Sequence, residues 1–168
     1  MAATAEIIDQ LCLACGICCN GVLFADVELQ PGDDADKLHG LGLSVRAAKF
    51  PQPCAALGAG CRCRFYADRP ARCRQFECAL FKKAAAGEVT VPAALRTIRQ
   101  TLQLAAQVED LLRRLGDSEE QRALSLRFQR MRKRIHAMEL DEETAAFFGE
   151  LTLAVHELNL ALRREFYP

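Results

Sequence analysis

The sequence predicts a mainly α protein, in which a small, irregular, metal-stapled cysteine-rich domain precedes an antiparallel helical hairpin or three-helix segment. Two observations lead to this expectation. All cysteines of the 168-residue chain lie before residue 79, and the second half carries apolar residues at helical spacing. Most glycines and prolines also precede residue 93, so we place the boundary near residues 87–92. The predicted domains are residues 1–90, which bind metal, and residues 91–168, a helical segment that packs on them.

The first half is predicted to contain only short elements. Asp33 or Asp34 is suited to cap a helix that Gly40 would end. The predicted elements are a helix over residues 5–11, a short strand within residues 21–29 and a helix over residues 35–39. Such elements bury little apolar surface, and a bound metal is the usual substitute for a core of this size.

The second half is predicted to form three helices with recognisable first and last residues. Pro92 is suited to the first turn of one helix, and Gly116 would end that helix. Ser118 and Gln121 form a capping-box pattern for the second helix, and Asp141 would cap the third. The apolar seams are Leu95, Ile98, Leu102 and Ala105 on the first helix, Leu124, Phe128, Met131, Ile135 and Met138 on the second, and Phe148, Leu151, Val155, Leu158 and Leu162 on the third.

Each seam has to be buried, and short loops make neighbouring helices antiparallel. The seams are therefore expected to pack against one another and against the metal domain. A second use of the same faces is self-association, which would produce a homodimer through the C-terminal helices.

Composition and charge argue against several kinds of partner. The chain has 22 Lys and Arg and 22 Asp and Glu, and this neutrality argues against nucleic acid and membrane surfaces. No apolar run approaches the roughly 20 residues of a membrane-spanning helix, so no membrane partner is expected. The N-terminal residues lack the pattern of a secretion signal, so we expect a cytoplasmic protein. Its nine cysteines would then be reduced, and metal ligation explains them better than disulfides.

The first cysteine group is the run Cys12-Leu13-Ala14-Cys15-Gly16-Ile17-Cys18-Cys19. Two-residue gaps allow both sulfurs of a Cys-x-x-Cys turn to reach one ion, and Gly16 permits the tight backbone. Three cysteines at successive two-residue gaps also resemble the run that binds an iron–sulfur cluster. The adjacent side chains of Cys18 and Cys19 are expected to diverge, so that they serve different centres or one of them is not a ligand.

The second cysteine group contains Cys54, Cys61, Cys63, Cys73 and Cys78. Five arginines are interleaved with it: Arg62, Arg64, Arg69, Arg72 and Arg74. Thiolate ligands give an anionic centre, and nearby guanidinium groups favour the thiolate form. Phosphate binding is the alternative use of these arginines. His39 lies between the two groups as a further candidate ligand, whereas His136 and His156 are interpreted as ordinary helix residues.

These motifs resemble the YkgJ-type cysteine-cluster family, whose signature is Cys-x-x-Cys-x-x-Cys-Cys and whose members are described as zinc- or iron-chelating domains. The stretch from Pro53-Cys54 to Cys78 resembles the second block of the family. The resemblance implies the ligand set Cys12, Cys15, Cys18, Cys19, Cys54, Cys63, Cys73 and Cys78. Cys61 is additional to the usual eight, so it ranks lowest as a ligand. Similar clusters occur in flagellin lysine-N-methylases, which suggests a [4Fe-4S] cluster as an alternative to a single zinc or iron ion.

The predicted function is therefore metal binding through clustered cysteine thiolates, for chelation, sensing or delivery of zinc or iron. The chain shows no Ser–His–Asp arrangement and no phosphate-binding glycine loop, which favours a protein that is not an enzyme. One alternative is an enzyme or electron carrier that depends on an iron–sulfur cluster. Another is an adaptor in which the metal is purely structural.

Overall fold

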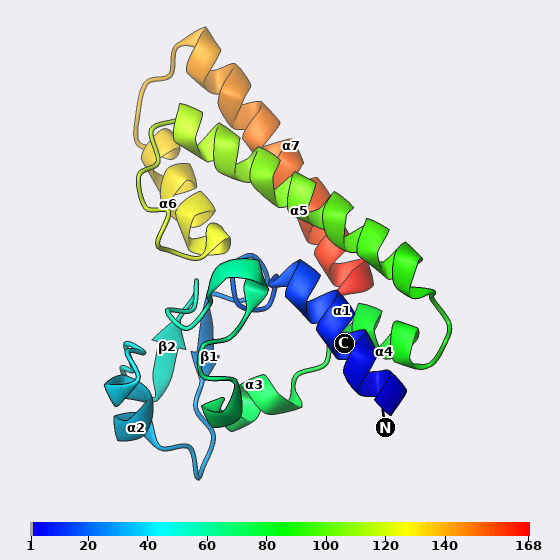
Figure 1. The fold of residues 1–168 in the computed structure, drawn as a ribbon. Coiled ribbons are helices and arrows are strands. Elements are labelled where there is room, and N and C mark those ends of the chain that lie inside the picture. Colours follow the sequence, from blue (N-terminus) through cyan, green and yellow to red (C-terminus); the bar gives the residue numbers. More distant parts are fainter. Residues whose placement is uncertain (1) are drawn as a thin grey trace.

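The computed structural model describes residues 2–168, with the side chains of residue 7 and of residues 10–168. Its largest feature is a pair of long helices, α5 (Val91–Arg114) and α7 (Glu142–Glu165), which lie side by side (Figure 1). A shorter helix, α6 (Leu124–His136), lies beside one end of this pair. The predicted mainly α fold, with a cysteine-rich region followed by helices, is confirmed.

Local sequence signals define both ends of α5 and the start of α7. Thr90 caps α5 by accepting a hydrogen bond from the Ala93 backbone N–H at 3.4 Å, and Pro92 lies in the first turn. Gly116 follows the helix with a φ of 80°, a left-handed conformation that favours glycine. The Asp141 carboxylate caps α7 by accepting from the Thr144 N–H at 2.7 Å. The predicted start and end of α5 and the predicted cap of α7 are thus confirmed.

The predicted capping box of the middle helix is wrong. The α6 helix begins at Leu124, and its N-cap residue is Ala123, which makes no side-chain capping bond. The physical reason is long-range pairing. Asp117 and Glu119 form ion pairs with Arg127 and Arg130 of α6, so the chain from 117 to 123 runs back along the helix as a loop.

The Asp117–Arg127 pair is buried, and its removal is expected to destabilise the helical half strongly. The Arg127 Nε lies 2.7 Å from the Asp117 Oδ2, and the two side chains are 4% and 5% exposed. Asp117→Ala leaves a buried, unpaired guanidinium, which we expect to cost about 3–5 kcal/mol in the free energy of unfolding. Urea unfolding measures this loss. The control is Asp110→Ala at an exposed pair, where at most about 1 kcal/mol is expected, and equal losses for the two variants would contradict the prediction.

Met138 does not extend the seam of α6, contrary to the predicted pattern. The helix ends at His136, and the Met138 side chain is 54% exposed. The backbone leaves the helix through bonds from the N–H of Ala137 to Arg134 O and from that of Met138 to Ile135 O. The last predicted seam position therefore lies in a turn.

The main hydrophobic core joins the long helices to the beginning of the chain. Leu11 of α1 (Ala2–Cys15), Ile17, and Leu80 of α4 (Ala79–Ala85) are buried in the same cluster as residues of α5 and α7. The C-terminus returns to this region (Figure 1), where the Tyr167 hydroxyl donates to Leu23 O at 3.1 Å. The first cysteine group is thus attached to the core that holds the helices, and α1 is longer than the predicted helix over residues 5–11.

Residues 26–75 form a separate small lobe with its own core. Its elements are β1 (Asp26–Glu28), α2 (Ala35–Gly40), β2 (Lys49–Pro51), the 3₁₀ turns η1 (Ala59–Cys61) and η2 (Tyr66–Asp68), and α3 (Ala71–Gln75). The strands β1 and β2 pair antiparallel, with Val27 opposite Phe50. The core of the small lobe consists of Val27, Leu38, Leu43, Phe50 and Ala56. The strand and helix predicted around residues 21–39 are confirmed, with Asp34 as the helix cap, whereas β2, α3 and α4 were not predicted.

Candidate metal centre

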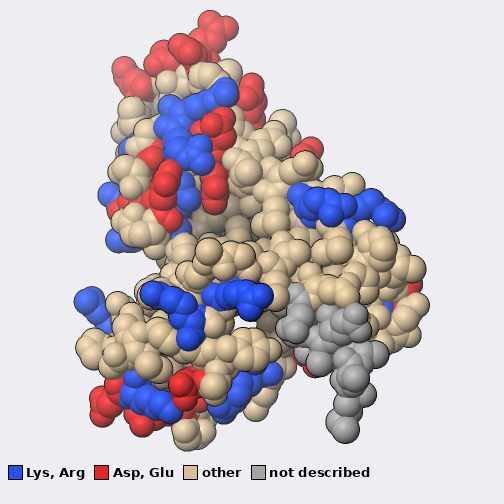
Figure 2. Space-filling model, viewed as in Figure 1, with Lys and Arg blue, Asp and Glu red and all other residues tan. Residues whose placement is uncertain are grey.

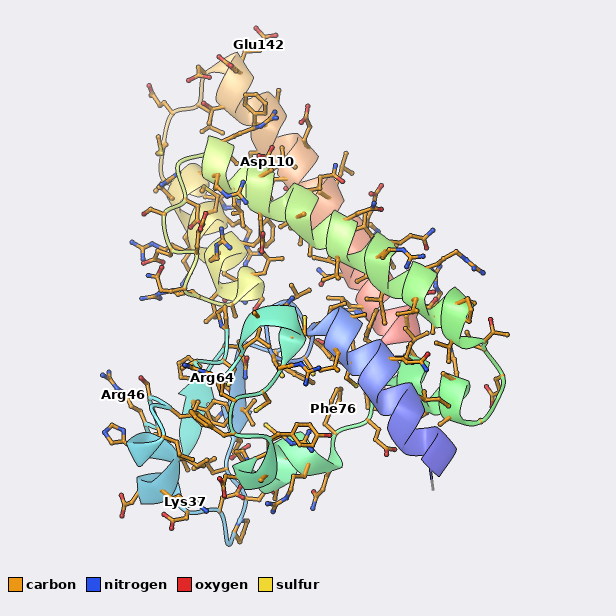
Figure 3. All side chains as sticks on the ribbon, viewed as in Figure 1. Lys37, Arg46, Arg64, Phe76, Asp110 and Glu142 are labelled. Atoms are coloured by element: carbon orange, nitrogen blue, oxygen red, sulfur yellow. The ribbon has the colours of Figure 1, made fainter. Side chains whose placement is uncertain are left out.

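The nine cysteines lie where the end of α1 meets the small lobe and α4. The nine are not joined in disulfides, and eight are partly buried while Cys12 is exposed. They come from the last turn of α1, the turn that follows it, the segment from residue 54 to 63, α3, and the residue before α4. Phe24 and Phe76 pack against the main core and contact edge to face, with ring centroids 5.1 Å apart, and Figure 3 shows Phe76 beside α1. The fold therefore brings together cysteines that lie up to 66 positions apart, from Cys12 to Cys78.

The end of α1 presents the first cysteines in a tight turn. Cys12 and Cys15 lie one helical turn apart, on the same face of α1. Gly16 then takes a φ of 62°, and its carbonyl accepts from the Cys19 N–H at 2.8 Å. The predicted role of Gly16 is thus confirmed. The Cys18 and Cys19 sulfurs lie 3.6 Å apart, so the expectation that these side chains diverge is wrong, because the turn orients them to the same side.

A hairpin-like loop carries Cys54 and Cys63. Its two arms are joined by a bond from the Gly58 N–H to Arg62 O at 2.7 Å and by one from the Arg64 N–H to Ala56 O at 2.8 Å. The Cys54 N–H donates to Cys19 O at 2.8 Å, which ties this loop to the turn after α1. Cys19, Cys54 and Cys63 are thereby positioned by backbone bonds rather than by a regular sheet.

The Asp33 carboxylate positions the helix that carries Cys73. Its Oδ1 accepts from the Ala71 N–H at the start of α3, and its Oδ2 accepts from the Gln30 N–H, both at 2.8 Å. A salt bridge of 2.7 Å from Lys37 on α2 to Asp68 joins a second pair of elements. These contacts hold α3 against the loop that follows β1.

Backbone N–H groups donate to two of the sulfurs. The Cys54 Sγ accepts from the Ala56 N–H, and the Cys78 Sγ, at the N-cap of α4, accepts from the Phe81 N–H, both at 3.4 Å. Such bonds favour the thiolate and are the outer contacts that support sulfur ligands of metals. Burial is nevertheless the larger effect, and it raises the pKa of both thiols.

The electrostatic neighbours of Cys15 and Cys73 indicate two groups of thiols, and Cys61 borders both groups because it also lies near Cys19. Burial, followed by the charges of Cys78, Cys12 and Cys61, raises the pKa of Cys15 to about 12. Burial, followed by Cys19, Cys54 and Cys63, raises the pKa of Cys73 to about 12. We call Cys12, Cys15 and Cys78 the α1 group, and Cys19, Cys54, Cys63 and Cys73 the lobe group. A hydrogen bond to Cys18 and burial raise the pKa of Cys19 as well.

The chemistry of these groups fits a thiophilic metal. Partly buried sulfurs with raised pKa values stay protonated at neutral pH unless a cation replaces the protons. Sulfur is the donor preferred by zinc in structural sites and by iron–sulfur clusters. In the part of the chain whose side chains are described, no three His, Cys, Asp or Glu already stand in ligation geometry. Binding therefore requires the thiols within a group to turn toward a common point.

Comparison with known proteins identifies the family of the cysteine-containing region. The family model described as "CxxCxxCC: Putative zinc- or iron-chelating domain" matches residues 11–100. The chain belongs to the CxxCxxCC family. The resemblance in the cysteine motifs is thereby confirmed, and membership supports metal binding in general. No curated protein and no solved structure matched the chain. No helix within residues 2–168 is long and apolar enough to cross a membrane.

In this CxxCxxCC protein, Arg69 is the arginine that reaches the lobe group. Its charge lowers the pKa of Cys19 and Cys73, against the larger effects that raise them. The guanidinium is held 3.7 Å above the Tyr66 ring, and its Nε donates to Tyr66 O at 3.1 Å. The other four interleaved arginines are exposed: Arg62, Arg64, Arg72 and Arg74. Figure 2 shows basic and acidic groups mixed along the lower edge of the small lobe, rather than an unbroken basic surface.

The three histidines lie on helices α2, α6 and α7, outside the segments that carry the cysteines. His39 is exposed on α2. His136 and His156 line a groove of about 340 Å³ between α6 and α7, and the His136 ring contacts Phe148 at 6.3 Å. This groove is formed by the helical half, apart from the cysteine segments.

Proposed function

We propose that this protein binds zinc or iron through cysteine thiolates and serves in chelation, sensing or delivery of that metal. The ligands proposed from the family pattern are Cys12, Cys15, Cys18, Cys19, Cys54, Cys63, Cys73 and Cys78. The α1 group and the lobe group would each supply donors to one centre.

The grouping of the thiols is the observation that carries this proposal. Segments far apart in the sequence converge on the end of α1, and specific backbone bonds, such as that from Cys54 to Cys19, hold them there. Cysteines that merely fill a core would have no reason to gather. Nine cysteines that are not joined in disulfides agree with a protein of a reducing compartment, and we propose the cytoplasm.

An iron–sulfur centre is the second candidate, and the spacing of the α1 cysteines favours it. Cys12, Cys15 and Cys18 follow one another at two-residue gaps, as in runs that bind such clusters. A cluster of this kind would make the protein an electron carrier or a cluster-dependent enzyme. The third candidate is an adaptor, in which the metal is purely structural and the helices form the surface that binds a partner.

Anaerobic purification of the full chain, followed by elemental analysis, tests the proposal. We expect stoichiometric zinc or iron, and a brown colour only if the iron is in a cluster. Cys63→Ser or Cys73→Ser should lower the bound metal sharply, because each removes a donor from the lobe group. A wild-type protein that binds neither metal, even after anaerobic reconstitution, would refute the function.

We further propose that the outer face of α7 pairs two chains. Leu153 and Leu160 are 67% and 53% exposed, and their spacing of seven places them on one face of the helix. Sedimentation of the wild type should show a dimer, and Leu153→Glu with Leu160→Glu should yield a monomer. The control is Leu126→Glu on α6, which should leave the mass unchanged. A wild-type monomer at every concentration would remove this proposal.

A further inference from the structure

Cys61 is the cysteine that lies outside the family pattern, yet the structure places it against the α1 group. It ends η1, which contacts α1. A Cβ added at Gly16 would lie 2.7 Å from the Cys61 Sγ and 3.2 Å from its Cβ, so the sulfur rests directly on the glycine that follows Cys15. Only a glycine leaves room for this approach.

The approach also depends on an unusual backbone. Cys61 has a φ of 54° and Gly60 a φ of 62°, both in the left-handed region. A cysteine rarely adopts that conformation, and here it places the Cys61 sulfur against Gly16 at the end of α1. Cys61 thus lies beside the α1 group, although, after the larger effect of burial, Cys19 of the lobe group is also near enough to raise its pKa.

We propose, on the basis of the proposed metal-binding function, that Cys61 is the fourth ligand of a metal centre at the end of α1. Its other donors are the α1 group: Cys12, Cys15 and Cys78. The lobe group already contains four thiols, so the two centres would each have the four sulfur donors that a tetrahedral zinc site or a cubane cluster requires.

Cys18 is the thiol left over by this assignment. Its sulfur lies 3.6 Å from that of Cys19, a member of the lobe group, which already has four thiols. This reverses the order implied by the family pattern, in which Cys18 is a ligand and Cys61 is an addition.

Cobalt(II) is a suitable probe because its absorption reports bound thiolates directly. We would titrate the full chain anaerobically with cobalt and compare the wild type with Cys61→Ser and with the matched control Cys18→Ser. The wild type and Cys18→Ser should each bind two ions with the same charge-transfer spectrum. Cys61→Ser should bind one ion normally and the other at least about 100-fold more weakly, because losing even an outer contact costs about 10- to 100-fold.

A second variant separates ligation from folding. Cys61→Ala removes the sulfur without changing the turn at Gly16, so it should weaken the same centre as Cys61→Ser, and circular dichroism should show unchanged helix content. Two unaltered ions in Cys61→Ser, or the loss of an ion in Cys18→Ser, would overturn the assignment while leaving the metal-binding function intact. Failure of the wild type to bind any cobalt would overturn both.

Discussion

Removing the metal should unfold the small lobe while the long helices remain. The lobe has strands of three residues and a core of five buried residues, so apolar burial contributes little to its stability. Structural zinc sites in small domains supply roughly 10 kcal/mol or more of folding free energy. Hydrogen exchange after chelation should therefore show loss of amide protection across residues 26–75. The helices α5 and α7 should keep their protection.

Helix α1 provides the internal control for this experiment. Leu11 and Ile17 are buried in the core of the long helices, so the backbone around them should stay protected without metal. Returning zinc or iron should restore the lobe. Full protection of residues 26–75 in metal-free protein would show that the lobe folds without ligation.

Metal affinity should rise steeply with pH. Burial and neighbouring thiols raise the pKa of Cys15 and of Cys73 to about 12, so both are protonated at neutral pH. A coordinated thiol must release its proton, and protons therefore compete with the metal as the pH falls. Well below these pKa values, each released proton should change the affinity by about tenfold per pH unit.

Competition titrations against a chelator of known pH dependence, between pH 6 and pH 8, measure this slope. Four thiols per ion predict a change approaching about four orders of magnitude per pH unit. Calorimetry in buffers of different ionisation enthalpy should find the same number of released protons. An affinity independent of pH would mean that the metal binds elsewhere than at these thiols.

The helical half could be predicted from sequence wherever the signal was local. Thr144 and Asp141 are three positions apart, and Gly116 acts through its own backbone, so both ends of α5 and the start of α7 followed from short motifs. The start of α6 did not, because Asp117 bonds to Arg127, ten positions away. A pairing at that distance overrides a capping pattern that looks sufficient by itself.

In the cysteine site, too, local motifs could be predicted from the sequence and long-range contacts could not. Spacing alone predicted the clusters and the tight turn at Gly16. The division of the thiols into two groups could not be predicted from their spacing, because it depends on contacts between residues far apart in the sequence. Examples are the Cys61 sulfur against Gly16 and the bond from the Ala71 N–H, at the start of α3, to the Asp33 carboxylate. The short elements β1 and α2 were found through the Pro31–Gly32 turn and the Asp34 cap, whereas α3 has no side-chain cap, and β2 and α3 are too short to show a periodic pattern.

X-ray absorption at the metal edge of the anaerobically purified full chain identifies the atoms bound to the metal. We expect a first shell of sulfur only, with four sulfurs per metal at about 2.3 Å for zinc. Cys61→Ser should change that shell, whereas Cys18→Ser should not. A first shell of nitrogen or oxygen in the wild type would contradict the claim that cysteine thiolates hold the metal.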